Sequence, residues 1–300
     1  MSAFYTGRVN QGGYMHNSEV DNYNEYALRW SYAQICEILR KIFDKINHTK
    51  VKQEYNITFL LAVSFSKALT TFEEIITLLY NGFPNGALAL SRNLYENYVI
   101  ILFIYSYNID CPDLLHKYID YYNYETAKME KLRNEDILSG ITDTGIDNEC
   151  SRQLIKDAHA AIDSASKKMD IFREKYSSRD FKDYWWAIDI LKNPNFAEIQ
   201  NKLIIDNKLD RAYRAHYKYA CTKIHCSFFG IFDNLGDSSD DLYFSRIFDG
   251  YEIPLGFSLF IFINHIQLFS SHYDQVLFQN LIEQLCLIAE EYESVITGVG

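Results

Sequence analysis

The stretch "ALALSRNLYENYVIILFIY" (residues 87–105) is almost entirely apolar or aromatic, and its few polar residues lie in the first half. A helix with so little polar surface is expected to be covered by other helices on nearly every side. Arg92 and Glu96 are four residues apart, so they can pair on one side of this helix. Buried charges need partners, so the pair either links helices as a structural polar contact or lines a cleft.

Working outward, hydrophobic periodicity predicts helices on both sides of this stretch. The residues "NGFPNG" (81–86) predict a turn, which makes the helix before it antiparallel to the helix over 86–108. Asn195 is expected to cap the helix that begins at Phe196, and "DYWWAI" (183–188) is expected to anchor a loop by its rings. The stretch 137–148 is predicted to be a polar loop. The other predicted helices cover 18–49, 54–80, 112–133, 150–176, 196–206, 208–231, 256–271 and 273–297.

The composition favours an all-α protein. Only 4 prolines and 13 glycines interrupt 300 residues, whereas average usage would give about 15 and about 21. We therefore expect a flexible N-terminal arm over residues 1–17 and a single bundle-like helical domain of about eight or nine helices over residues 18–300. Within that domain, residues 54–231 are expected to form the core and residues 256–297 a C-terminal helix pair.

Charge, cysteine usage and hydropathy narrow the class of protein. The net charge of −11 argues against a protein that coats nucleic acid or a membrane surface as a whole, although a local basic site remains open. Six cysteines without a CxxC spacing, and a start without a signal-peptide pattern, indicate reduced thiols in a cytoplasmic protein. The apolar stretches 97–107 and 254–269 are shorter than a bilayer span. They predict buried helices, so no membrane partner is expected.

A second chemically distinctive segment is "RAYRAHYKYACTKIHCS" (residues 211–227). At about 100° per residue, one face of this helix is apolar and is expected to face the core. It consists of Tyr213, Tyr217, Ala220, Ile224 and Phe228. The stripe beside it is cationic and ends in a histidine. It consists of Arg211, Arg214, Lys218, Cys221 and His225. His216 lies about 180° from His225 on this wheel, so the two histidines cannot act together within one unbroken helix.

Three chemistries are compatible with this segment. Cys221, His225 and Cys226 could bind a metal, but structural zinc sites need four ligands in recognisable pairs, so neither a metal nor a cofactor is expected. Cys221 and His225 could form a nucleophilic dyad, although no third partner is evident. A general acid or base His225 at the end of a cationic stripe suits cleavage of RNA without a metal. The alternative without chemistry is a half-buried histidine beside solvated lysines and arginines.

Together, the Arg92–Glu96 pair and the later "YKYACTKIHCS" helix resemble an uncharacterised family of mostly bacterial helical proteins. Members of that family carry an Arg-x-x-x-Glu motif on an early apolar helix and a tyrosine-rich helix that ends in histidine. Tyr217 and His225 match the second motif, and "DYWWAIDILKNPNFAEI" (183–199) matches the Trp-containing stretch before it. The resemblance extends from about residue 60 to about residue 230.

This family in turn resembles the HEPN group of helical bundles, which are often dimers and include ribonucleases of toxin–antitoxin and phage-defence systems as well as inert binding modules. The resemblance implies a HEPN-like core and a candidate metal-independent endoribonuclease or RNA-binding effector. Active HEPN proteins use an Arg and a His that are separated by four to six residues. Arg211 and His216 fit that spacing, so His216 is an alternative catalytic residue.

The resulting hypothesis assigns catalysis to Arg92, Glu96 and His225, with His225 as acid or base and Glu96 orienting Arg92. Substrate binding is assigned to four residues of the later helix. They are Arg211, Arg214, Tyr217 and Lys218. The expected partners are RNA and a second copy of the chain, with an antitoxin or another protein as a further partner. The competing hypothesis is a non-catalytic helical module for dimerisation or partner binding, in which the same polar residues fix the register of the helices.

Overall fold

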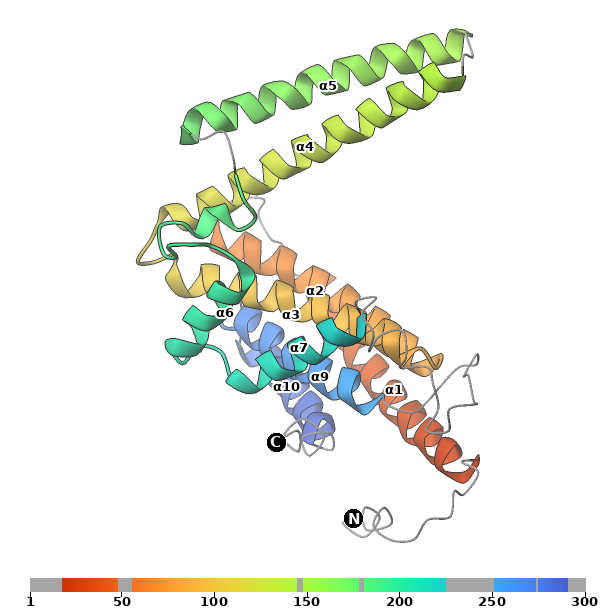
Figure 1. Ribbon diagram of the computed structural model, residues 1–300. Coiled ribbons are helices and arrows are strands. Elements are labelled where there is room, and N and C mark those ends of the chain that lie inside the picture. Colours follow the sequence, from red (N-terminus) through yellow and green to blue (C-terminus); the bar gives the residue numbers. More distant parts are fainter. Residues whose placement is uncertain are drawn as a thin grey trace.

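The computed structural model describes residues 18–47, 56–144, 148–177, 181–224, 251–273 and 275–290 (Figure 1). Within these ranges it contains nine α-helices, one short 3-10 helix and no β-strand, which confirms the predicted all-α fold. The elements are α1 (Ser18–Asn47), α2 (Ile57–Tyr80), α3 (Pro84–Tyr107), α4 (Asp113–Thr144), α5 (Glu149–Tyr176), η2 (Trp185–Ala187), α6 (Phe196–Ile205), α7 (Arg211–Ile224), α9 (Glu252–Ser270) and α10 (Gln275–Glu290).

Three helices from distant parts of the chain form the centre of a bundle. Helices α2, α3 and α9 pack against one another, α1 and α10 cover the α2 and α9 side, and α6 and α7 lie on α3 (Figure 1). Aromatic rings join α2 to α9: Phe65 stacks on Phe269 and Phe72 on Phe262, with centroid separations of 4.6 and 4.4 Å. Because α9 packs directly on α2 and α3, the C-terminal helix pair is part of the same core as the preceding helices.

Helix α9 carries the longest apolar stretch of the chain's later half. By length and composition alone it could cross a membrane, and it is the one such helix among the residues searched. In the fold, 72% of its most apolar window is buried by other helices. The stretches 97–107 and 254–269 therefore form core helices of the bundle, as their length predicts.

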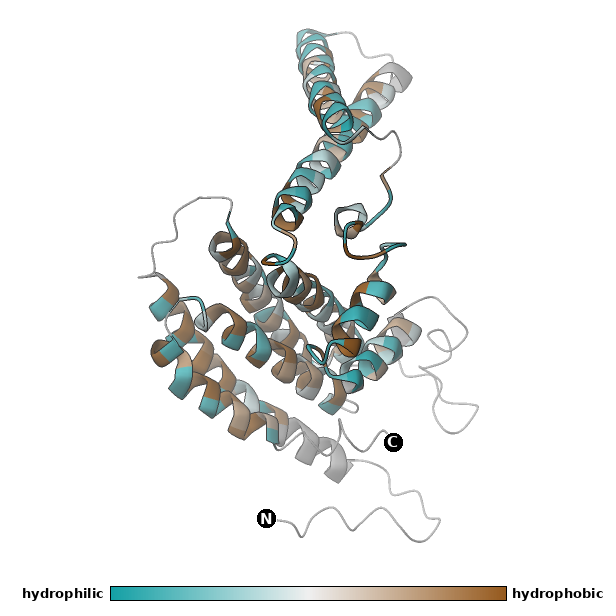
Figure 2. Ribbon diagram, turned by 90° about the vertical axis from the view of Figure 1, so that its left-hand side faces the viewer, coloured by the Kyte–Doolittle hydropathy of each residue, from teal (hydrophilic) through white to brown (hydrophobic). Residues whose placement is uncertain are grey.

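Helices α4 and α5 form an antiparallel hairpin that projects from the bundle (Figure 1). Figure 2 shows mainly hydrophilic residues along this hairpin and apolar residues concentrated in the bundle. A small separate cluster joins the two helices near the base. It consists of Tyr124, Ala127, Ala165, Met169 and Phe172. Few buried apolar residues therefore hold the two helices of the hairpin together.

The prediction that a helix ends near Arg133 and that a polar loop follows over 137–148 is wrong. Helix α4 continues to Thr144. Leu138 and Ile141 are partly buried and lie on the same side of α4 as Tyr124 and Ala127, which gives this stretch a side that packs towards α5. Ser139 and Gly140 between them are exposed, and these small residues produced the loop prediction.

Residues at the boundaries of several helices explain where those helices begin. The side chain of Asn195 accepts a hydrogen bond from the Glu198 amide at 3.0 Å, so the predicted cap of α6 is confirmed. Asn56 and Asn148 cap α2 and α5 in the same way. The turn between α2 and α3 uses Gly82 at φ 76°, a backbone conformation that favours glycine, and Pro84 begins α3.

Candidate functional site

The candidate site begins with the two charged residues of α3. Leu94, Tyr95 and Val99 of this helix are buried, whereas Arg92 and Glu96 lie at its margin with 25% and 27% of their side chains exposed. The guanidinium Nε of Arg92 donates a hydrogen bond to Glu96 Oε1 at 2.8 Å. The pair that the i,i+4 spacing predicts is therefore formed, and it is neither sealed in the core nor fully solvated.

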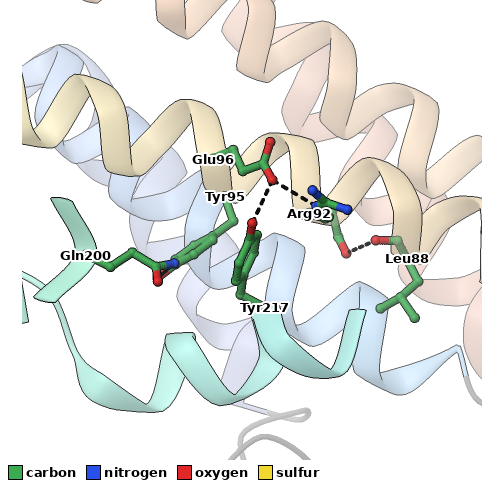
Figure 3. Close-up of polar contacts among 7 residues, drawn as sticks. Leu88, Arg92, Tyr95, Glu96, Gln200 and Tyr217 are labelled. Carbon is green, nitrogen blue, oxygen red and sulfur yellow. Dashed lines mark hydrogen bonds and ion pairs between the residues drawn. The ribbon is translucent and has the colours of Figure 1, made fainter. Parts of the chain in front are cut away.

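Helix α7 brings a third group to this pair. The Tyr217 hydroxyl donates to the same Glu96 Oε1 at 2.9 Å (Figure 3). The Arg92 guanidinium carbon also lies 5.6 Å from the centroid of the Tyr217 ring, within the range of a cation–π contact. One carboxylate oxygen thus accepts hydrogen bonds from two helices, and Tyr217 contacts both members of the pair.

Aromatic residues from α3, from α6 and from the segment before η2 support this cluster on its inner side. The Tyr217 ring lies 5.3 Å from Tyr95 of α3 and 5.1 Å from Phe196 at the start of α6. Tyr184, which precedes η2, packs on Phe196 at 6.1 Å. The Tyr95 hydroxyl accepts a hydrogen bond from the side-chain amide of Gln200 at 3.2 Å (Figure 3). These contacts restrict the position of Tyr217 and, through it, of Glu96.

The protonation states follow from burial and from the shared carboxylate. Burial raises the pKa of the Tyr217 phenol, and the adjacent Glu96 raises it further, so the hydroxyl remains a donor at neutral pH. Burial also raises the pKa of Tyr184, with the charge of Glu96 acting in the same direction. Partial burial of Arg92 is the largest single influence and opposes its charged form, but the hydrogen bond and charge of Glu96, together with Cys221 and Tyr217, outweigh it and raise the pKa of Arg92. Arg92 is therefore a fixed cation.

The predicted cationic stripe of α7 lies on the solvent side of that helix. Arg211 and Lys218 are exposed, while Arg214 is half-buried and donates to the Asn201 side-chain oxygen at 2.7 Å. On the opposite side, Ala220 is buried, and Tyr213 and Tyr217 pack on the core. The two faces drawn from the sequence are thus present in the described part of α7.

The Arg211-x4-His216 spacing does not bring its two residues to one side of the helix. His216 has only 6% of its surface exposed, and its ring lies 5.5 Å from the Phe257 ring of α9. Arg211 is exposed. The structure thus places His216 in the core-facing layer of α7 and Arg211 in the solvent-facing layer.

His225 and Cys226 lie outside the described residues, which end at residue 224 in this part of the chain. The proposed meeting of His225 with Arg92 is therefore still a prediction. Cys221 is described: it is half-buried, and its interactions affect the pKa of both Arg92 and Tyr217. Among the side chains that the structure describes, no three His, Cys, Asp or Glu residues converge on a position that could hold a metal.

Sequence reasoning missed several residues of the site and its support. Tyr184 and Phe196 lie in the stretch 183–199 that the sequence singles out, but their contacts with the site, like that of Gln200, are tertiary and no local pattern predicts them. His265 did carry a signal, since it is a polar residue within the apolar α9. It is buried, its Nε2 lies 3.5 Å from the Leu94 carbonyl oxygen, and burial lowers its pKa to about 4. His265 is thus a neutral core residue directly behind the α3 site.

Two surface hollows lie elsewhere. One of about 560 Å³ is on α4 and is lined by Met129, Leu132, Arg133, Asp136 and Ile137. The other, of about 490 Å³, lies between α1 and α10, with Trp30 and Leu287 among its lining residues. Neither hollow includes Arg92, Glu96 or Tyr217.

Comparison with known proteins places this site within a family. The sequence profile of a family of unknown function (DUF5677) matches residues 58–242, more than half of the chain. The matched range includes α2 to α7, and with them Arg92, Glu96 and Tyr217. Searches of the curated proteins and of the solved structures found no match.

Proposed function

The chain belongs to this family of unknown function, and we propose that it is a cytoplasmic HEPN-like protein that binds RNA and cleaves it without a metal, as an effector of toxin–antitoxin or phage-defence type. The observation that carries the proposal is the position of Arg92. A buried helix holds this cation at the surface, and Glu96 and Tyr217 orient it. A guanidinium oriented in advance is suited to binding phosphate oxygens.

The surface of α7 extends this cationic character. Arg211 and Lys218 are exposed, and the side-chain amide of Asn201 holds Arg214 in place. In a chain with a net charge of −11, such a local concentration of positive charge favours a polyanion at this face and disfavours it elsewhere. Binding is expected to involve phosphates first, with little sequence preference and a strong dependence on salt.

Cleavage is assigned to His225 from its place in the sequence, four residues after Cys221. As a base, it would take the proton of a ribose 2′-hydroxyl, whose oxygen then attacks the neighbouring phosphorus. The bond to the 5′-oxygen breaks, that oxygen receives a proton, and a 2′,3′-cyclic phosphate remains. Arg92 would stabilise the charge that develops on the phosphate oxygens.

RNA binding is tested by titrating a fluorescein-labelled single-stranded RNA with the full chain at several salt concentrations. The double variant Arg211→Glu/Lys218→Glu is expected to bind at least tenfold more weakly. The plot of log K against log salt has a negative slope, and its magnitude should fall by roughly 1.4, the value for two lost phosphate contacts on a single strand. The matched control, Arg40→Glu/Lys67→Glu, reverses two exposed charges on α1 and α2. Equal weakening in both double variants, or no binding by the wild type at low salt, would sink the proposal.

Cleavage is tested separately with the same RNA in the presence of EDTA. The wild type is expected to produce fragments that end in a 2′,3′-cyclic phosphate, and His225→Ala is expected to abolish them while leaving RNA binding intact. Undiminished cleavage by His225→Ala would show that His225 is not the catalytic acid or base. Binding without any cleavage by the wild type would restrict the function to an RNA-binding module.

One observation favours the competing function, a non-catalytic module for dimerisation or partner binding. Glu96 accepts hydrogen bonds from both α3 and α7, so the cluster also locks two helices in register. If that is its whole purpose, Tyr217→Phe should destabilise the fold by about 1 kcal/mol through the lost hydrogen bond and leave RNA affinity unchanged. Thermal unfolding and the RNA titration of this variant separate the two functions.

A further inference from the structure

The outer face of α4 is an unusual surface for a projecting hairpin. Tyr122, Met129 and Leu132 are exposed although they are large and apolar. They recur at spacings of seven and three residues, which places them on one side of the helix, and α5 packs on the other side, where Tyr124 and Ala127 are buried. The hairpin therefore has a second apolar stripe that no described helix covers.

This stripe is hollowed and carries two opposite charges. Met129, Leu132 and Ile137 line the hollow of about 560 Å³ together with Arg133 and Asp136. Within the described part of the chain, neither Arg133 nor Asp136 makes a side-chain hydrogen bond or an ion pair, although each is exposed beside an apolar surface. A positive and a negative charge three residues apart, with apolar groups around them, form a face that is complementary to itself when a second copy is turned by 180°.

Gly140 lies on the same side of α4, and nothing in the described part of the chain accounts for a glycine there. A Cβ atom at this position would meet no atom within 4 Å, and residue 140 is exposed within the helix. An exposed glycine inside a helix costs about 1 kcal/mol relative to alanine. A glycine at such a position is explained if another helix approaches the backbone closely.

From these three features we propose that α4 is a self-association surface, on which the α4 helix of a second copy lies antiparallel across a two-fold axis. Pairing Arg133 with Asp136 of the partner subunit fixes the register. The same register opposes Leu132 to Ile137 of the partner subunit, and Met129 to Gly140 of the partner subunit, where the missing side chain leaves room for the methionine. A two-fold axis makes each of these contacts twice.

A second copy fits this face better than a different partner because each residue around the hollow finds its complement in the same stripe. The two apolar residues meet, the two charges pair, and the largest exposed apolar side chain near the hollow meets the smallest residue. The four helices of the two hairpins then enclose the stripe that a single hairpin exposes. This inference does not depend on RNA binding.

Two single charge reversals test the register. In the Arg133→Asp variant both inter-subunit pairs become Asp with Asp, and in the Asp136→Arg variant both become Arg with Arg. Sedimentation equilibrium of the full chain should show a wild-type dimer and at least a tenfold weaker association of either variant alone, because two attractions become two repulsions. An equimolar mixture of the two variants restores opposite charges at both contacts, so it should form a heterodimer with near wild-type affinity.

Recovery on mixing cannot arise from effects within one chain, such as a weakened helix. Lys156→Asp, which reverses an exposed charge on α5 of the same hairpin, is the control and should remain a dimer. The proposal is overturned by a wild type that stays monomeric, by single variants that associate as well as the wild type, or by a mixture that fails to recover.

Discussion

The bundle and the projecting hairpin are both built from packed α-helices but are held together differently. In the bundle, α9 is buried by α2, α3 and α10, and stacked phenylalanines run through the interface. In the hairpin, α4 and α5 share one seam, and its aromatic cluster lies only near the base, around Phe172. The helices of the bundle should therefore unfold together in the global transition, whereas the hairpin should be able to unfold locally while the bundle stays folded.

The largest effect is expected from removing a ring at the centre of the bundle. Phe262 is fully buried and stacks on Phe72 at 4.4 Å. Phe262→Ala should lower the free energy of unfolding by about 4 kcal/mol, because it removes apolar contacts and leaves a cavity. Denaturant unfolding measures this loss. Phe83→Ala, at a ring that is 46% exposed, is the control and should cost less than about 1 kcal/mol. Equal losses would show that the centre of the bundle is not close-packed.

A second difference between the two regions is sensitivity to acid. Burial lowers the pKa of His265 to about 4, from an ordinary value near 6.5. The unfolded chain therefore binds a proton that the folded bundle excludes, and stability falls as the pH drops from about 6.5 to about 4. The full loss is about 3 kcal/mol.

Unfolding free energies of the wild type and of His265→Leu, measured between pH 7 and pH 4, test this contribution. The difference between the two proteins should shift by about 3 kcal/mol in favour of the variant at the acid end. His159→Leu, at an exposed histidine of the hairpin, should follow the wild type throughout. A constant difference between wild type and His265→Leu would mean that His265 is not held neutral in the folded protein.

The smallest of the three effects should appear in the hairpin. Phe172 contacts Tyr124 and Phe181 at centroid distances of 4.7 and 4.6 Å. Phe172→Ala should cost about 2 kcal/mol, below the usual range for a core phenylalanine because the gap at this rim can fill with water. Hydrogen exchange should show lost protection in α4 and α5 while α2, α3 and α9 remain protected.

Ile171, next to Phe172 but 64% exposed, supplies the control, and Ile171→Ala should leave exchange in both regions unchanged. If Phe172→Ala instead lowers protection throughout the chain, the hairpin and the bundle unfold as one unit, and the distinction between them is wrong.

The elements of the fold were largely predictable because few prolines and glycines interrupt strong helical periodicity. The capping residue Asn195 and the turn before Pro84 are local signals, and both were identified. The end of α4 was not, because Gly140 and its small neighbours indicate a loop unless α5 is known to pack beside Leu138 and Ile141. Whether a glycine stands in a loop or in a close helix contact depends on tertiary structure.

The candidate site was likewise predictable where its contacts are local in the sequence, and not where they are tertiary. The Arg92–Glu96 pair follows from i,i+4 spacing in an apolar helix, and it is formed. The hydrogen bond from Tyr217 to the same carboxylate joins residues far apart in the sequence, so spacing cannot reveal it. The aromatic support from Tyr184 and Phe196 depends on how the segment before α6 folds back onto α3.

The short helix η2 connects the two regions mechanically. Trp186 is buried between Phe103 of α3 and Tyr118 of α4, at 5.9 and 5.1 Å. Helix α4 extends for 26 residues beyond Tyr118, from 119 to 144, which is about 39 Å, so a tilt of about 5° at this pivot displaces its far end by roughly 3 Å. A small tilt of the hairpin therefore becomes a large movement of its tip, and the residue about which it tilts, Trp186, packs on the helix that carries Arg92 and Glu96. A displacement of the tip therefore reaches α3 through Trp186 as well as through the direct contacts between α3 and α4.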